Sequence, residues 1–308
     1  MAETVRDTIK EIVRSHLTEK SGLAFGQCLT AVGWVGGTLP ELYEEDGMVE
    51  LSMADVAGGG IVVGSALMGR RPMYIIRYQG FNWYNSPMIV NYACKSKEIW
   101  QRPCPIFVRS IAMEGSIGPV AGSSHHSLYH RMPGIKIASP MTPSEYKSVY
   151  EHFMEHDDVV YVSEHRGSYN NTEELPDKET PDPDIILFPI SITRFEAEKA
   201  RRSLTSMGFN VNIYHQLWLK PHNLKRDWIR AVNSSKYGAI VLDDDFEDGI
   251  GKCMARDIMM KTDKKVHVMG LEQRTAGFHK KVDNLPPTAE QIINKVLELR
   301  EQYELKKP

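Results

Sequence analysis

Short apolar segments alternate with helical segments along most of this chain, and this alternation limits the folds that it can adopt. Segments apolar enough for buried strands occupy residues 73–77, 105–109, 135–138, 159–162, 185–188, 211–214, 239–242 and 266–268. Helix-like segments lie between several of them, at residues 55–68, 86–99 and 143–155. Such alternation is typical of βαβ units around a parallel sheet that is covered on both faces. We therefore predict an α/β fold.

A polar segment divides the chain into two regions of this kind. Residues 169–184 are polar and acidic and include three prolines, a composition that cannot build a core. Beyond this segment the alternation begins again, and Thr288 with Gln291 has the spacing of a capping box that starts a last helix. A length of 308 residues also favours more than one core. We predict two α/β domains, residues 1–178 and 179–308.

Composition argues against several classes of partner. Lys and Arg (37) nearly balance Asp and Glu (40), so the sequence predicts no nucleic-acid surface. The apolar stretch at residues 58–69 is far shorter than the ~20 residues that span a bilayer, so no membrane partner is expected. The cysteines have no Cys-x-x-Cys spacing, which argues against a zinc site or a disulfide framework. We expect a reduced, cytoplasmic protein with no metal site of its own.

Residues 52–72 contain an unusual run of glycines inside a predicted helix. Gly58, Gly59 and Gly60 each weaken a helix by up to about 1 kcal/mol relative to alanine, so another interaction should offset them. Close helix packing is one explanation, and close approach of a ligand is the other. The spacing fits neither Gly-x-Gly-x-x-Gly nor a phosphate loop with Gly-Lys-Ser or Gly-Lys-Thr, so neither nucleotide site is predicted.

Three further clusters contain side chains suited to chemistry. The loop 122–134 holds His125, His126 and His130, which suit proton transfer or anion binding but could equally serve only to bond backbone groups. No nearby Cys, Asp or Glu completes a metal site there. Residues 78–84 place aromatic side chains after a strand, where they either pack in the core or line a crevice. Residues 164–166 follow another strand and fit an ion-paired strand end.

In their order and spacing, these clusters make the chain resemble the beta subunits of the thiamine-diphosphate-dependent decarboxylating component of 2-oxo acid dehydrogenase complexes, and more broadly the second half of transketolases. That family has an acidic residue before a Gly/Ala-rich helix ending in Gly-x-Arg-Pro, matched here by residues 55–72. Phe81 matches its phenylalanine, and His126-Ser127 matches its His-Ser pair. Further matches are Pro-Gly-x-Lys-x-x-x-Pro at 133–140, Leu-Lys-Pro at 219–221 and Gly-Leu at 270–271.

The resemblance implies a role for each matched residue. In the family, the acidic residue bonds a ring nitrogen of the aminopyrimidine of thiamine diphosphate, the phenylalanine stacks on that ring, and the histidine contacts the substrate. Transferred by position, Asp55, Phe81 and His126 take these roles. Met53 and Tyr84 are further candidates for the cofactor pocket, and His125 is a second candidate for proton transfer. The resemblance also implies a pyrimidine-binding domain followed by a transketolase C-terminal-like domain.

The chain differs from the family at acidic positions. Asp55 stands where the family has glutamate, and withdrawing a carboxylate by about 1 Å can cost on the order of 100-fold in rate. The family's early Gly-Glu-Asp is Gly26-Gln27-Cys28 in this chain. These differences leave open a catalytically degenerate subunit that serves assembly or regulation.

The chain also lacks the Gly-Asp-Gly signature with a later asparagine that holds Mg²⁺ and the diphosphate in thiamine enzymes. The resemblance therefore implies a partner alpha subunit that carries the diphosphate and Mg²⁺, in an α2β2 heterotetramer. The implied reaction is decarboxylation of a 2-oxo acid with acyl transfer, and a lipoyl acyltransferase is a candidate further partner. The alternatives are a split-transketolase or carboligase subunit acting on a ketose or acyloin, and a free-standing binding module, which leaves the histidine loop unexplained.

Overall fold

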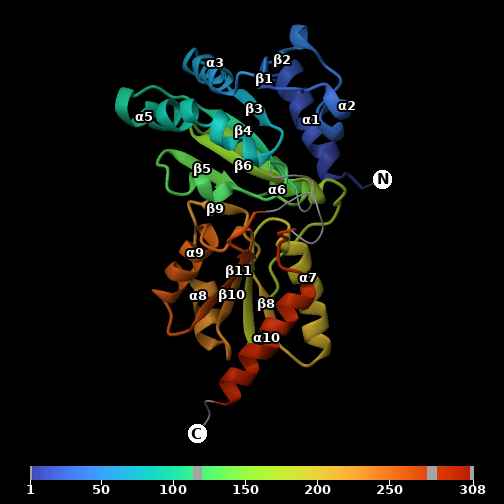
Figure 1. The fold of residues 1–308 in the computed structure, drawn as a ribbon, viewed down its shortest axis with the longest axis vertical. Coiled ribbons are helices and arrows are strands. Elements are labelled where there is room, and N and C mark those ends of the chain that lie inside the picture. Colours follow the sequence, from blue (N-terminus) through green and yellow to red (C-terminus); the bar gives the residue numbers. More distant parts are fainter. Residues whose placement is uncertain (1, 114–119, 276–282, 306–308) are drawn as a thin grey trace. The chain divides into compact units, whose positions relative to one another are not determined.

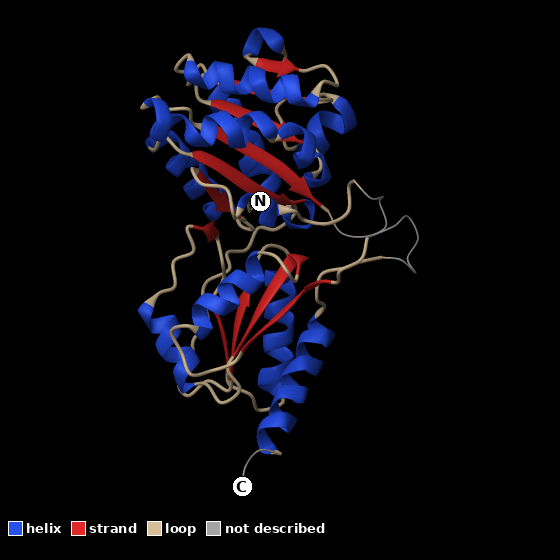
Figure 2. Cartoon of the chain, turned by 60° about the vertical axis from the view of Figure 1, so that its left-hand side comes forward, coloured by secondary structure: helices blue, strands red, loops and turns tan. Residues whose placement is uncertain are grey.

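The computed structural model describes residues 2–113, 120–275 and 283–305 (Figure 1). Within these ranges the chain forms two compact units, each built around its own sheet (Figure 2). The first unit comprises residues 2–113, 120–174 and 218–221, and the second comprises residues 175–217, 222–275 and 283–305. None of the helices in the described ranges is both long enough and apolar enough to cross a membrane.

The first unit contains a seven-stranded sheet in the order β2-β1-β3-β4-β6-β5-β9. Its strands are β1 (Leu23–Gly26), β2 (Met48–Glu50), β3 (Pro72–Ile76), β4 (Ile106–Ala112), β5 (Ile135–Ala138), β6 (Val159–His165) and β9 (Trp218–Lys220). Neighbouring strands are parallel except for β5 and β9, which pair antiparallel. Every residue of β3, β4 and β6 is buried, so both faces of this sheet are covered and these strands are mostly apolar.

Helices of several lengths cover the sheet of the first unit. They are α1 (Val5–Thr18), α2 (Ala31–Gly37), α3 (Asp55–Leu67), α4 (Asn82–Asn85), α5 (Cys94–Trp100) and α6 (Pro143–Glu155). Shorter turns are η1 (Glu44–Asp46), η2 (Gln79–Phe81), the π-helical η3 (Ile89–Ala93), η4 (His126–Tyr129) and η5 (Arg166–Ser168). Helix α1 packs on α6, and α3 packs on β1, β3 and β4. Within α2 the backbone from Val32 to Gly36 is left-handed, with φ between 50° and 66°.

The second unit contains a four-stranded parallel sheet in the order β11-β10-β7-β8. Its elements are β7 (Ile185–Pro189), α7 (Thr193–Ser206), β8 (Val211–Ile213), α8 (Arg226–Ser234), β10 (Ala239–Phe246), α9 (Ile250–Met259), β11 (Val266–Leu271) and α10 (Ala289–Glu304). Leu187 of β7 belongs to the core cluster with Leu204 of α7 and Val296 of α10. The next residue, Phe188, points to the opposite face and packs on Trp228 of α8, with ring centroids 6.0 Å apart. Helices therefore cover both faces here as well.

The predicted α/β class is confirmed, and each predicted strand is present. Strands β4, β6, β10 and β11 extend three or four residues beyond the predicted ends. In β6 and β10 the added residues are mostly polar, which hides them from a search for apolar segments. Strands β1, β2 and β9 were not predicted, since three or four residues are too few to show a period. Strand β9 follows the predicted domain boundary in sequence, yet it pairs with β5 in the first unit.

Candidate functional site

A cavity of about 180 Å³ lies in the first unit at the carboxyl ends of β1 and β3, and we call it the Asp55 cavity. Its lining residues are Gln27, Cys28, Met53, Asp55, Ile75, Ile76, Arg77, Tyr78, Phe81 and Asn85. Open parallel sheets bind ligands at the carboxyl ends of their strands. Of the described residues that line this cavity, Asp55 is the one with a carboxylate, so carboxylate chemistry from this lining depends on it.

Asn85 holds the Asp55 carboxylate in place. Its Nδ2 donates a 2.8 Å hydrogen bond to Asp55 Oδ1 and a 3.0 Å bond to the carbonyl oxygen of Phe81. Its Oδ1 accepts a hydrogen bond from the Tyr74 hydroxyl, and burial raises the pKa of Tyr74, which keeps that group a donor. The Asn85 amide therefore has one orientation. Among the described residues, nothing bonds Asp55 Oδ2, which is the oxygen left for a ligand.

The glycine run that opens α3 is explained by close packing. A Cβ on Gly59 would lie 2.8 Å from the Asn85 carbonyl oxygen, and one on Gly58 would lie 3.1 Å from Leu51 Cδ1. The helix can therefore approach the α4 segment closely enough for Asn85 to reach Asp55. Gly64, in contrast, has no described atom within 4 Å of a built Cβ.

The aromatic and methionine candidates occupy different positions. Met53 lines the Asp55 cavity and is 86% exposed, and Phe81 lines it and is 36% exposed. Tyr84 lies on α4, is 59% exposed and is not among the residues that line the cavity. Phe81 also packs against Tyr78, with ring centroids 6.0 Å apart. The structure thus brings Asp55, Met53 and Phe81 together at one opening.

The two candidate histidines lie in and beside η4, near buried polar side chains of the sheet. His126 is fully buried, and its Nδ1 lies 3.1 Å from Ser163 Oγ on β6. His125 is partly buried, its backbone N–H donates to Gln79 Oε1 (2.5 Å), and its ring lies 5.7 Å from that of Trp83. Gln79 and Ser163 were not singled out from the sequence, because 84 residues separate them and no local pattern connects them.

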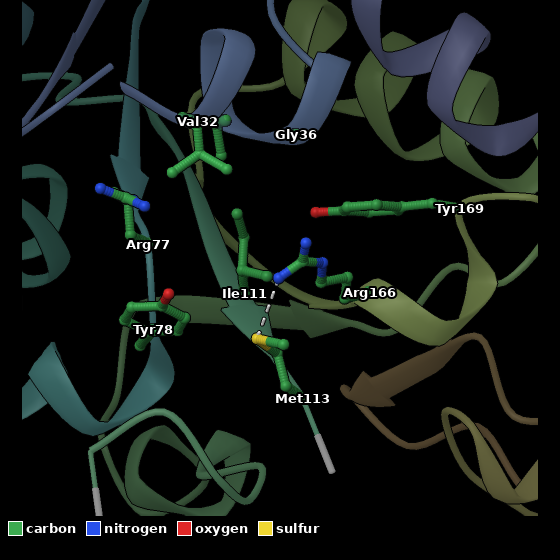
Figure 3. A pocket seen from close by; sticks show the side chains of 9 residues that line it. Val32, Gly36, Arg77, Tyr78, Ile111, Met113, Arg166 and Tyr169 are labelled. Carbon is green, nitrogen blue, oxygen red and sulfur yellow. Dashed lines mark hydrogen bonds between the residues drawn. The ribbon is translucent and has the colours of Figure 1, made fainter. Parts of the chain in front are cut away.

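A second, smaller cavity of about 50 Å³ shares Arg77 and Tyr78 with the Asp55 cavity, and we call it the arginine cavity. Figure 3 shows Arg166 beside Tyr169 in this cavity, and its Nη1 donates a hydrogen bond to the Met113 sulfur (3.6 Å). Within the described part of the chain, neither Arg77 nor Arg166 forms an ion pair. Two guanidinium groups without carboxylate partners give this cavity a positive charge.

The neighbouring Glu164 is the ion-paired strand end that the sequence suggested. It accepts hydrogen bonds from Arg109 Nε (2.9 Å) and Nη2 (2.7 Å), from Tyr146 (2.6 Å) and from Tyr169. Burial by itself would raise the pKa of Glu164, but the Arg109 charge and these hydrogen bonds lower it. Glu164 is therefore a structural anion and does not serve the cavities directly.

Comparison with known proteins identifies a family for the first unit. The family model described as the transketolase pyrimidine-binding domain matches residues 5–172. The 2-oxoisovalerate dehydrogenase subunit beta of Bacillus subtilis is 26% identical over 206 residues, covering 63% of this chain and 58% of that protein. The pyruvate dehydrogenase E1 component subunit beta of Staphylococcus epidermidis is 21% identical over 287 residues, covering 84% of each chain.

Solved structures are similar over nearly the whole chain. A structure titled as a split gene transketolase, inactive beta4 tetramer, has a TM-score of 0.73 at 13% identity and covers 97% of this chain and 98% of that one. The transketolase of Campylobacter jejuni has a TM-score of 0.72 at 15% identity, with 96% of this chain matching 47% of that one. At these identities the likeness establishes the two-unit transketolase-like fold.

Proposed function

We propose that this chain, which belongs to the transketolase pyrimidine-binding domain family, is a beta-type subunit of a thiamine-diphosphate enzyme that acts on a 2-oxo acid. The observation that carries the proposal is the meeting of Asp55, Asn85 and Phe81 at one cavity. The alignments with beta subunits of 2-oxoisovalerate and pyruvate dehydrogenases support the substrate class. In this proposal the first unit is the pyrimidine-binding domain, and the second is the C-terminal domain.

The lining of the Asp55 cavity fits an aminopyrimidine ring. Asp55 Oδ2 would accept a hydrogen bond from that ring, and the partly exposed face of Phe81 would stack on it. Met53 would cover the ring edge. Thiamine diphosphate supplies, when bound, a carbon nucleophile for the carbonyl carbon of the substrate. Asp55 holds and releases a proton at Oδ2, because Oδ1 stays bonded to Asn85.

A partner subunit completes the site in this proposal. The Asp55 cavity offers one carboxylate, whereas a cation bridging a diphosphate requires several oxygen ligands. We therefore assign the diphosphate and Mg²⁺ to an alpha subunit in an α2β2 assembly. A lipoyl acyltransferase would accept the acyl group, and the unpaired state of all four cysteines agrees with a reducing, cytoplasmic setting.

The outer face of α3 is the surface that we assign to this partner. Val56, Ile61 and Leu67 are 51%, 51% and 46% exposed, which is unusual for apolar residues of one short helix. Gly64 is exposed on α3 and has no described atom within 4 Å of a built Cβ, which leaves room for close approach of another backbone. Because Asp55 begins this helix, a partner docked here would also approach the Asp55 cavity.

Gly64→Ala tests the docking surface. An exposed Gly→Ala change in a helix interior stabilises the single chain by up to about 1 kcal/mol, yet the added methyl group should weaken association with the partner. Ser65→Ala adds no atom at the neighbouring position and serves as the control. Sedimentation of mixtures with an alpha subunit carrying the Gly-Asp-Gly signature measures the effect. Unchanged association would remove the α3 face from the proposal.

The arginine cavity supports an anionic substrate. Arg77 lines both cavities, so an acid group held between Arg77 and Arg166 would lie next to a ligand of the Asp55 cavity. Guanidinium groups suit a carboxylate because they present parallel donors. A 2-oxo acid carries its carboxylate beside the reacting carbonyl carbon, which matches the contact between the two cavities.

Asp55→Asn is the decisive experiment for the catalytic assignment. The variant keeps the size and removes the ionisable group, so exchange of the thiazolium proton should slow by roughly 10²–10⁴-fold in the assembled enzyme. Asp227→Asn, on an exposed aspartate of α8, is the matched control. Exchange is followed by NMR at equal cofactor occupancy. Equal exchange rates of the thiazolium proton in wild type and Asp55→Asn would show that Asp55 is only a structural residue at the start of α3.

A further inference from the structure

The arginine cavity has a cationic side chain on each of two opposite sides. Arg77 follows β3 and Arg166 follows β6, and Figure 3 shows the apolar side chain of Ile111 between them. Arg166 Nη1 donates to the Met113 sulfur (3.6 Å), and among the described residues its Nη2 and Nε hydrogens remain for a ligand. Two separate guanidinium groups with an apolar side chain between them suit a molecule that is anionic at both ends.

The size of the arginine cavity limits what such a molecule can be. Its volume of about 50 Å³ holds about four water-sized groups, because each takes roughly 10–15 Å³. A carboxylate on a short methylene chain is of this size. Val32, Val35 and Ile111 make part of the lining apolar, so a charge in the cavity is screened less than in water. Arg77 is half-buried and Arg166 is exposed, so both keep their charge while the cavity is open to a ligand.

The two arginines differ in their distance from the chemistry that we propose. Arg77 lines both cavities, whereas Arg166 lines only the arginine cavity. The carboxylate beside the reacting carbonyl therefore belongs at Arg77, because that carbonyl must face a cofactor bound in the Asp55 cavity. An apolar substrate side chain would then end against the unpaired Arg166 charge. A carboxylate at the end of that side chain would pair with Arg166 instead.

We propose that the substrate is a short 2-oxo dicarboxylic acid and that Arg166 is the residue that selects it. About one or two methylene groups separate the carbonyl carbon of this substrate from its second carboxylate, because the arginine cavity has no room for more. The inference rests on the proposed function for the reaction, and it narrows the substrate class of the same site. Arg77 binds the carboxylate that every 2-oxo acid carries, and Arg166 binds the one that distinguishes a dicarboxylic acid.

Binding of 2-oxoglutarate and 2-oxopentanoate to the full chain, without cofactor or partner, tests the inference. The two acids have carbon chains of the same length, and they differ in ending with a carboxylate or a methyl group. We expect the chain to bind 2-oxoglutarate at least about 10-fold more tightly, the lower end of what hydrogen bonds to a charged group contribute. Calorimetry or ligand-observed NMR measures both affinities, at one ionic strength because salt screens these charges.

Substitutions of the two arginines separate their roles. Arg166→Met should remove the preference for 2-oxoglutarate with little effect on 2-oxopentanoate, whereas Arg77→Met should weaken binding of both acids. Arg166→Lys should keep part of the preference, because lysine retains the charge but not the two parallel donors. Arg226→Met is the control, since it removes the same charge from an exposed position on α8.

Two results overturn the inference. One is the lack of any preference of the wild-type chain for 2-oxoglutarate, and this comparison needs no variant. The other is an equal loss of both acids in Arg166→Met, which would show that Arg77 and Arg166 clamp a single carboxylate. Neither result bears on Asp55, so failure here is distinguishable from failure of the proposed function. Conversely, an Asp55→Asn enzyme with normal thiazolium proton exchange would remove the function and leave the preference of the arginine cavity for a dicarboxylic acid standing.

Discussion

Replacing Glu164 by glutamine should destabilise this protein more than any surface charge change. The Glu164 carboxylate is 1% exposed and neutralises Arg109, which is completely buried. It accepts two hydrogen bonds from that guanidinium and one from each of Tyr146 and Tyr169. Glu164→Gln leaves the buried arginine charge without a counter-charge, and breaking such a pair typically costs about 4 kcal/mol. Total stabilities are only about 5–15 kcal/mol, so the loss is large.

Urea unfolding followed by tryptophan fluorescence measures this change, with the slope checked for two-state behaviour. Lys147→Met is the control, because its ion pair with Glu3 is nearly half exposed and should contribute less than about 1 kcal/mol. The double variant Arg109→Met/Glu164→Gln should be more stable than the sum of the single changes predicts, by at least about 2 kcal/mol. Additive losses would show that Arg109 and Glu164 do not depend on each other, and the argument would fail.

The same pair predicts a pH dependence. The pKa of Glu164 is lower in the folded chain than its ordinary value of 4.5, because the Arg109 charge and the hydrogen bonds outweigh burial. The contribution of this carboxylate is therefore complete above about pH 4.5 and is lost as the pH falls through the folded pKa. Glu164→Gln should show a smaller loss of stability on acidification. An unchanged acid profile would contradict the assignment.

Further predictions concern the strained turn and a buried histidine. Val32 is 66% exposed and has a left-handed backbone, so Val32→Gly should raise the urea midpoint of unfolding by removing strain of about 1 kcal/mol. Val56→Gly, in the right-handed helix α3, should lower that midpoint. A shift of the urea midpoint in the same direction for both variants would contradict the left-handed turn. Burial lowers the pKa of His16 to about 4, below its ordinary 6.5, so the unfolded chain binds more protons between these values. The free energy of unfolding should therefore fall by roughly 3 kcal/mol as the pH drops from 6.5 to 4, and it should fall less steeply in His16→Gln. The same dependence of unfolding free energy on pH in both proteins would contradict the lowered pKa of His16.

Several elements follow from the sequence because their signals are local. Parallel strands covered on both faces must be apolar at nearly every position, and β3, β5 and β7 show this directly. Helix α10 begins where Thr288 and Gln291 form a capping box, since both residues lie within one turn. Asp55 and Phe81 were placed in the site through the family resemblance, and the structure brings both to the Asp55 cavity.

Other features exist only because distant segments meet. Strand β9 is three residues long and pairs with β5, about 80 residues earlier, so no local sequence pattern predicts it. Arg77 and Arg166 belong to one cavity because parallel strands end at the same edge of the sheet. The hydrogen bonds that Ser163 makes with Gln79 and with His126 depend on strand register, which is a property of the folded sheet. Residue types suited to chemistry can be recognised along the chain, whereas their hydrogen-bond partners depend on which strand ends the folded sheet brings together.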